Sequence, residues 1–184
     1  MAAYYFLKER KSMLLSVLII AGIIVSDRLV KYWAMTVLAP AVELEGIRGV
    51  FHFYYVENTG AAFSILREHT WILIVITAFV VAAGIYVLFF KKLNLPYQIC
   101  IASIVGGGLG NLIDRIFYGY VVDMFMFDFV EFAIFNVADI FITLGGIAII
   151  VVLLFFDNKT PLLKRKNNSA EIADESTDDT TEDN

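Results

Sequence analysis

Aspartate and asparagine side chains recur at short spacings inside or beside apolar stretches of this 184-residue chain. Asn111 and Asp114 stand three residues apart, as do Asn136 and Asp139, and Asp123 lies between the two pairs. An ionised group costs about 2.5–3.5 kcal/mol at the centre of a membrane helix, so such residues need partners or a function. Two neighbouring carboxyl groups share a proton, and such a pair can activate water while it protonates a leaving group. The residue types therefore favour carboxylate chemistry.

The elements that position these residues are membrane helices. The chain is 59% hydrophobic and only 18% charged, more apolar than a soluble domain of this size can bury. Crossing a hydrocarbon core takes about 20 apolar residues, and four runs are long enough: Met13–Met35, Trp71–Phe90, Tyr97–Phe117 and Val137–Phe156. The first run has no small-residue cleavage site, so we interpret it as an uncleaved span rather than a signal peptide. The composition predicts an all-α membrane protein with four transmembrane helices.

Basic residues set the orientation of the spans. They gather before the first span, between the second and third, and after the fourth, at Lys8, Arg10, Lys11, Lys91, Lys92, Lys159, Lys164, Arg165 and Lys166. With an even number of spans these groups share one side, which the positive-inside rule makes the cytoplasm. Both termini are then cytoplasmic, and four aspartates meet near the extracytoplasmic interface: Asp27, Asp114, Asp123 and Asp139.

The C-terminal segment differs in composition from the rest of the chain. Seven of the 19 acidic residues lie between Glu171 and Asp183, among Ser, Thr and Asn. Without these seven acids the formal charge changes from −5 to +2, and the segment has almost nothing to bury. We therefore predict a membrane domain over residues 1–160 and a disordered acidic cytoplasmic tail over residues 161–184.

The extracytoplasmic segments are rich in aromatic residues. Gly49–Val56 has the composition of a short strand and is followed by a turn at Asn58-Thr59-Gly60. Ile65–Trp71 is a candidate interfacial helix, and alternating phenylalanines make Tyr118–Phe135 strand-like. We expect a small extracytoplasmic cradle of strands and loops. Its aromatic residues suit either ordinary interfacial anchors or a lipid-facing platform.

Glycines and charges inside the spans allow competing interpretations. Gly106 and Gly110 favour close helix packing over a nucleotide-binding loop, because they lie in an apolar span without a P-loop lysine. Asp27 and Lys31 share one helical face and form either a local ion pair that reaches toward the interface or part of a site. Arg115 is expected to neutralise a nearby carboxylate.

Metal and thiol chemistry have little support in the sequence. His52 and His69 stand apart without ligand-like neighbours, and Cys100 lies in an apolar run as a small buried side chain. We expect no metal, no cofactor and no nucleic-acid partner.

Five blocks of sequence together resemble the bacterial lipoprotein signal peptidases, or signal peptidase II. They are Ser26-Asp27-Arg28-Leu29-Val30-Lys31, Glu57-Asn58-Thr59-Gly60-Ala61-Ala62-Phe63-Ser64, Gly110-Asn111-Leu112-Ile113-Asp114-Arg115, Val121-Val122-Asp123 and Phe135-Asn136-Val137-Ala138-Asp139. Each block alone is weak, but five in order from Met13 to Phe156 are specific. The acidic tail lies outside the resemblance.

The resemblance implies an aspartyl endopeptidase of the bacterial cytoplasmic membrane. Such enzymes remove the signal peptide from prolipoproteins whose lipobox cysteine carries a diacylglyceryl group, and they cleave just before that cysteine. Carried over by motif, Asp123 and Asp139 become the catalytic pair. The supporting and substrate-binding positions become Asp27, Lys31, Asn58, Gly60, Asn111, Asp114, Arg115 and Asn136. Membrane lipids would also contact the enzyme, and Phe51, Phe53, Phe125 and Phe127 would form a cradle and lid.

Two other function classes, a transporter and a non-enzymatic scaffold, are alternatives to a peptidase. A proton-coupled transporter needs polar groups through the full membrane thickness, whereas Leu88–Phe90 and Ile147–Leu154 have none. A non-enzymatic scaffold would bury Asn111, Asp114 and Asn136 at a cost and without a purpose. Both alternatives explain less of the sequence than a membrane peptidase.

Overall fold

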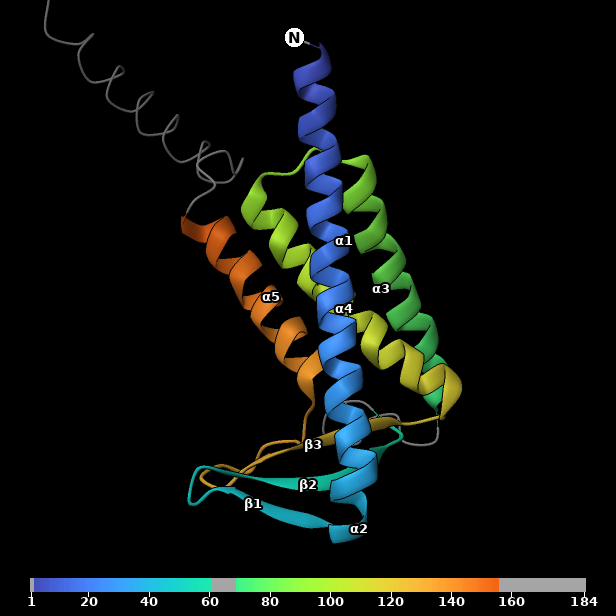
Figure 1. Ribbon diagram of the computed structural model, residues 1–184, viewed down its shortest axis with the longest axis vertical. Helices are drawn as coiled ribbons and strands as arrows, with labels where there is room; N and C mark the ends of the chain where they lie inside the picture. Colours follow the sequence, from blue (N-terminus) through green and yellow to red (C-terminus); the bar gives the residue numbers. More distant parts are fainter. Residues whose placement is uncertain (1, 61–68, 156–184) are drawn as a thin grey trace, which may run out of the picture.

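Four long helices and a small sheet make up the computed structural model, which describes residues 2–60 and 69–155 (Figure 1). The helices long and apolar enough to cross a membrane, among these residues, cover Ser12–Ala41, Thr70–Phe90, Leu95–Phe117 and Val137–Phe155. The last three are α3, α4 and α5. The four predicted spans are confirmed, although the first helix extends to Ala41 rather than ending at Met35.

The first span changes its helical form near its end. Helix α1 (Ala2–Trp33) runs into the π-helical segment η1 (Ala34–Leu38) and then the single turn α2 (Ala39–Ala41). Ala34 and Leu38 are fully buried and pack against Val122 and Met124 of the sheet. The wider turn of a π-helix redirects side chains relative to an α-helix. Here η1 presents its buried residues to the sheet and joins it to the bundle.

Helix α4 is the centre of the bundle and packs against α1, α3 and α5. Gly106 and Gly110 both face α1: a Cβ on Gly106 would lie 3.1 Å from Ile23, and one on Gly110 would lie 2.8 Å from a carboxylate oxygen of Asp27. The small-xxx-small interpretation of these glycines is confirmed. The glycine at position 110 lets a charged side chain of α1 lie directly against the α4 backbone.

A three-stranded antiparallel sheet lies across the end of the bundle remote from the N-terminus (Figure 1). Its order is β1 (Glu43–Ile47), β2 (Phe51–Asn58) and β3 (Val121–Phe127). The predicted strand at Gly49–Val56 is confirmed as β2 with shifted ends. In the second aromatic segment, Tyr118–Phe135, the strand covers only Val121–Phe127, so the strand-like interpretation is partly confirmed.

Strand β1 was not predicted. Its residues alternate between exposed and partly buried positions, with Glu43 and Glu45 exposed, which is the pattern of a strand with one solvated face. Acidic residues are poor strand formers, and they obscured this alternation in the sequence. The cradle therefore has one more strand than its aromatic segments suggested.

The turn after β2, the candidate interfacial helix and the acidic tail lie at or beyond the ends of the described residues. Asn58 ends β2, and its side-chain oxygen accepts a hydrogen bond from the Gly60 backbone at 2.9 Å, which confirms a turn at this point. The candidate interfacial helix at Ile65–Trp71 lies mostly outside the described residues. The acidic tail at residues 161–184 lies wholly outside them.

We expect Gly107→Ala to destabilise the bundle. An added Cβ at Gly107 would lie 2.4 Å from the backbone oxygen of Ala138, so α4 and α5 would have to separate. Overpacking of this kind costs about 1–3 kcal/mol. The matched control is Gly22→Ala, because nothing lies within 4 Å of a Cβ there. Thermal unfolding in detergent should show a lower Tm for the first variant and an unchanged or higher Tm for the second; equal Tm values would contradict the packing described here.

Candidate active site

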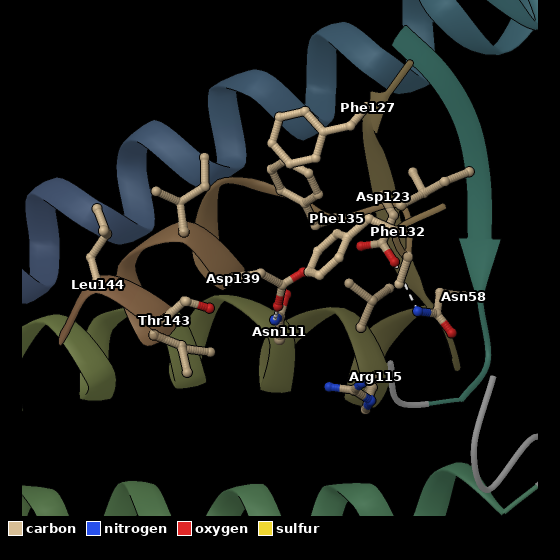
Figure 2. A pocket seen from close by; sticks show the side chains of 15 residues that line it. Asn58, Asn111, Arg115, Asp123, Phe127, Phe132, Phe135, Asp139, Thr143 and Leu144 are labelled. Carbon is tan, nitrogen blue, oxygen red and sulfur yellow. Dashed lines mark hydrogen bonds between the residues drawn. The ribbon is translucent and has the colours of Figure 1, made fainter. Parts of the chain in front are cut away.

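Asp123 and Asp139, the predicted catalytic pair, meet at the end of the bundle that bears the sheet. Asp123 comes from β3 and Asp139 from the first turn of α5, and both line one cavity (Figure 2). Asn136 joins them directly. Its side-chain nitrogen donates to Asp123 Oδ1 at 2.6 Å, and its backbone nitrogen donates to Asp139 Oδ2 at 3.2 Å. A loop residue thus holds a strand carboxylate and a helix carboxylate in one arrangement.

Three asparagine amides contact the two carboxylates, and the partner of each side-chain oxygen fixes the amide's orientation. The Asn58 oxygen accepts from the Gly60 backbone at 2.9 Å, and the Asn136 oxygen accepts from the Asp139 backbone at 3.0 Å. Both partners are N–H groups, which can only donate. The NH₂ groups must therefore face the carboxylates, and Asn58 donates to Asp123 Oδ2 at 2.8 Å (Figure 2).

Asn111 is oriented in the same way, but by a charged group. Its side-chain oxygen accepts from Lys31 Nζ at 3.0 Å and from the Asn136 amide at 3.1 Å. Its NH₂ group then donates to Asp139 Oδ1 at 2.7 Å. Lys31 on α1 is therefore linked to Asp139 on α5 by hydrogen bonds through the Asn111 amide of α4.

Lys31 belongs to a cluster of four buried or half-buried charges on α1 and α4. Its ammonium lies 2.9 Å from Asp27 Oδ2 and 2.7 Å from Asp114 Oδ2. Arg28 bridges the same two carboxylates, at 3.0 Å from Asp27 and 2.6 Å from Asp114. The two cations balance the two anions, so the cluster has no net charge.

Of the two alternatives for Asp27 and Lys31, the buried ion pair within the site agrees with the structure, and the pair that reaches toward the interface does not. These side chains are 0% and 2% exposed, so the pair does not reach toward the interface. Asp27 Oδ1 also accepts from the backbone nitrogen of Ala138 at 3.1 Å, in the first turn of α5. The free N–H groups at a helix start favour an anion, so Asp27 also fixes the start of the helix that bears Asp139.

Within the described residues Arg115 forms no hydrogen bond to a carboxylate, although its charge acts on Asp123 and Asp139 as expected. Its guanidinium donates to the backbone oxygen of Gly60 at 3.1 Å, and the neighbouring Asp114 pairs with Arg28 and Lys31 instead. Adjacent residues on a helix point about 100° apart, which turns Asp114 toward α1 and Arg115 toward the cavity. Arg115 therefore fixes the turn after β2 and supplies positive charge to the cavity wall.

The cavity beside the two aspartates has a volume of about 400 Å³ and is largely apolar. Its polar wall consists of Asn58, Asn111, Arg115, Asp123, Asp139 and Thr143, and the rest is aliphatic or aromatic. Phe127 is the one member of the predicted aromatic cradle that lines it. Phe53 instead packs against Trp33 and Phe125, with ring centroids 5.1 Å and 5.6 Å apart, so these rings join the sheet to α1.

The surroundings of Asp123 disfavour its charged form. Asp123 is 2% exposed, and this burial, followed by the charge of Asp139, raises the pKa of Asp123 to about 7. The hydrogen bonds from Asn58 and Asn136 oppose the rise without cancelling it. Near neutral pH the pair can therefore hold one proton, as general acid–base chemistry requires.

Three further contributors to the site, besides Thr143 of the cavity wall, were not predicted from the sequence. Arg28 was passed over although a cation within an apolar span needs a partner. Phe132 and Phe135 line the cavity, and Phe127 packs against Phe135 with ring centroids 5.1 Å apart. An isolated pairing of Phe125 with Phe135 folds this loop back onto β3, and such a long-range contact has no local sequence signal.

Comparisons with known proteins show the family to which this chain is similar. The family model for signal peptidase (SPase) II matches residues 19–155. The chain is similar to the lipoprotein signal peptidase of Clostridioides difficile strain 630, with 38% identity over 80% of this chain and 99% of the relative. It is also similar to the lipoprotein signal peptidase of Streptococcus pyogenes serotype M5, with 40% identity over 80% of this chain and 95% of the relative.

Solved structures show the same fold. A bacterial membrane enzyme determined by the in meso method at 2.3 Å resolution superposes with a TM-score of 0.73 and 32% identity, over 80% of this chain and 92% of that one. A second such structure, at 1.9 Å resolution, gives a TM-score of 0.70 over 77% of this chain and 94% of that one.

Lys31→Met should strongly destabilise the protein. The change leaves Asp27 and Asp114 with Arg28 as their cation and removes the donor that orients Asn111. Breaking a buried charge pair by removing one partner costs about 3–5 kcal/mol.

The control for this variant is Arg48→Met. Arg48 is 95% exposed and lies 4.0 Å from Glu45, so its removal should change stability by no more than about 0.5 kcal/mol. Denaturant unfolding in mixed micelles measures both changes. Equal stabilities of the two variants would refute the structural role of the cluster.

Proposed function

This chain belongs to the signal peptidase II family of aspartic peptidases, and we propose that Asp123 and Asp139 are its catalytic pair. The substrates would be prolipoproteins, from which the enzyme removes the signal peptide just before a diacylglyceryl-modified cysteine. The observation that carries the assignment is the meeting of two carboxyl groups from separate elements in one cavity, Asp123 buried and Asp139 partly buried, each bound by an asparagine amide.

The proposed reaction uses one proton held by the pair. Asp123 carries that proton, because burial and the charge of Asp139 raise its pKa. Asp139 lies in the first turn of α5, where N–H donors stabilise a carboxylate. Asp139 takes a proton from water, the water oxygen attacks the scissile carbonyl carbon, and Asp123 protonates the carbonyl oxygen. When the tetrahedral intermediate breaks its C–N bond, the proton on Asp139 goes to the leaving nitrogen and Asp123 recovers its own.

The remaining predicted site residues have positioning roles in this proposal. Asn58, Asn111 and Asn136 orient the carboxyl groups, while Asp27, Lys31 and Asp114 hold α1, α4 and α5 in register. Arg115 and Gly60 fix the end of β2 beside the cavity.

The cavity and the charges along the chain support the proposed lipid specificity and orientation. The apolar wall formed by Phe132, Ile140, Ile142 and Leu144 suits acyl chains, and α5 presents residues such as Leu144 and Ile147 to the surrounding lipid. In this proposal the sheet and both aspartates lie on the extracytoplasmic side of the cytoplasmic membrane, which the distribution of basic residues supports through the positive-inside rule. A signal helix would then end at the depth of Asp123 and Asp139.

The function is tested with a diacylglyceryl-modified precursor and its unmodified twin. We expect the purified enzyme to cleave the modified precursor and to leave the unmodified one intact. Mass spectrometry of the products identifies the cleaved bond. Equal cleavage of both precursors would refute the lipid specificity, and cleavage of neither would refute the peptidase activity.

Asp123→Asn and Asp139→Asn should each abolish turnover while the protein still folds. Asparagine keeps the shape of the side chain but cannot exchange a proton, and general acid–base groups contribute about 10²- to 10⁴-fold to the rate. Asp128→Asn is the matched control. Asp128 comes directly after β3, the strand that bears Asp123, and it pairs with His52 outside this cavity. Single-turnover rates should fall below detection for the first two and change little for the control. Near-normal turnover in either of the first two variants would exclude that residue from the pair.

The rate should fall as pH rises above about 7. Asp123 is protonated below its raised pKa and loses the catalytic proton above it, so kcat/KM, which reports the free enzyme, should fall about tenfold per pH unit well above that value. Circular dichroism at each pH separates this effect from unfolding. A rate that stays constant from neutral pH to about two units above it would contradict the assignment of the proton to Asp123.

A further inference from the structure

Thr143 is the polar residue of the cavity that lies on the membrane side of the two aspartates. It follows Asp139 by four residues on α5, so both side chains lie on one helical face, about 6 Å apart along the axis. Its hydroxyl is on the side that faces Asp139 and Asn111 (Figure 2). The neighbouring wall consists of Ile140, Ile142 and Leu144. Within the described cavity, hydrogen bonding at this depth depends on Thr143.

The Thr143 hydroxyl differs from several other hydroxyl groups in the spans. Those of Ser26, Thr36 and Ser103 donate to a backbone oxygen four residues earlier, at 2.8–2.9 Å. Across residues 2–60 and 69–155, no partner is found for the Thr143 hydroxyl, whose side chain is exposed to the cavity. It can therefore both donate and accept a hydrogen bond with a molecule in the cavity.

A signal peptide bound for cleavage has backbone groups that need hydrogen-bond partners, and the Thr143 hydroxyl can be one of them. The scissile carbonyl must leave the helical hydrogen-bond pattern before water can attack it, which frees backbone N–H and C=O groups nearby. In an apolar cavity each freed group costs free energy until it finds a partner. An extended chain advances about 3.3–3.6 Å per residue, so a distance of about 6 Å from Asp139 reaches roughly the second residue before the scissile bond.

We propose that Thr143 binds the unwound main chain of the signal peptide by accepting a hydrogen bond from an N–H group about two residues before the scissile bond. This role rests on the proposed function, in which the signal peptide reaches the aspartates from the membrane interior. The Thr143 hydroxyl binds the signal peptide only where its backbone is extended. Because it contacts a main-chain N–H group, its binding does not depend on the side chain of that residue.

The test compares Thr143→Val, which keeps the shape and removes the hydroxyl, with Thr143→Ser, which keeps the hydroxyl. Loss of one hydrogen bond should lower kcat/KM for the lipid-modified precursor by about 2- to 12-fold in Thr143→Val. The serine variant should stay within about twofold of the parent enzyme. Thr77→Val on α3 is the control, because Thr77 lies in a span but does not line the cavity.

Ester analogues of the precursor separate hydrogen bonding from packing. Each analogue replaces one N–H with an ester oxygen at the first, second or third residue before the scissile bond. At one of these positions, expected to be the second, the ester should lower kcat/KM of the parent enzyme. The same ester should cause no further fall in kcat/KM of Thr143→Val, which already lacks the hydrogen bond.

Three results would overturn the role of Thr143: unchanged kcat/KM in Thr143→Val, an equal loss in the valine and serine variants, or the same valine effect on every ester analogue. Failure of the parent enzyme to cleave the lipid-modified precursor would refute the proposed function itself. Cleavage by the parent enzyme together with any of the three results would refute only the role of Thr143.

Discussion

The buried pairing of two cations with two carboxylates, between α1 and α4, is the interaction on which the rest of the site depends. Any one of these charges left without partners inside the bundle would cost several kcal/mol, so the four residues constrain one another to a single arrangement. Asp27 also binds the first turn of α5, and Lys31 also binds Asn111. The cluster thus fixes three helices and the Asn111 amide together. Its lack of net charge allows this within an apolar surrounding.

Three asparagines bind the two carboxyl groups and fix their positions relative to the helices. An amide can rotate by half a turn and exchange its donor and acceptor ends, so its usefulness depends on what holds the oxygen. Backbone N–H groups hold Asn58 and Asn136, and the Lys31 ammonium holds Asn111. Every NH₂ group is therefore directed at Asp123 or Asp139. The two carboxyl groups stay close together, and that closeness together with burial raises the pKa of Asp123.

Patterns along the chain predicted the parts of the fold that depend on local composition. The four spans follow from hydropathy, and the gathering of distant aspartates follows from an even number of crossings. The role of Arg28, the partner of Arg115 and the place of Phe135 in the cavity all depend on which helix faces meet across the bundle. Hydropathy does not determine that rotation. Close approaches at Gly107 and Gly110 do, and they become visible only with α5 and α1 in place. Strand β1 was hidden for another reason, because its exposed glutamates are poor strand formers.

Titration of the aspartate carboxyl carbons by carbon-13 NMR tests the central claim most directly. With Asp123 assigned by substitution, its carboxyl carbon should titrate near pH 7 in the parent protein, well above the ordinary value near 4. In Asp139→Asn the pKa of Asp123 should fall, because the neighbouring charge is gone while burial remains. An Asp123 carboxyl that titrates near 4 in the parent protein, or whose pKa is unaffected by Asp139→Asn, would show that the two residues are not a coupled pair.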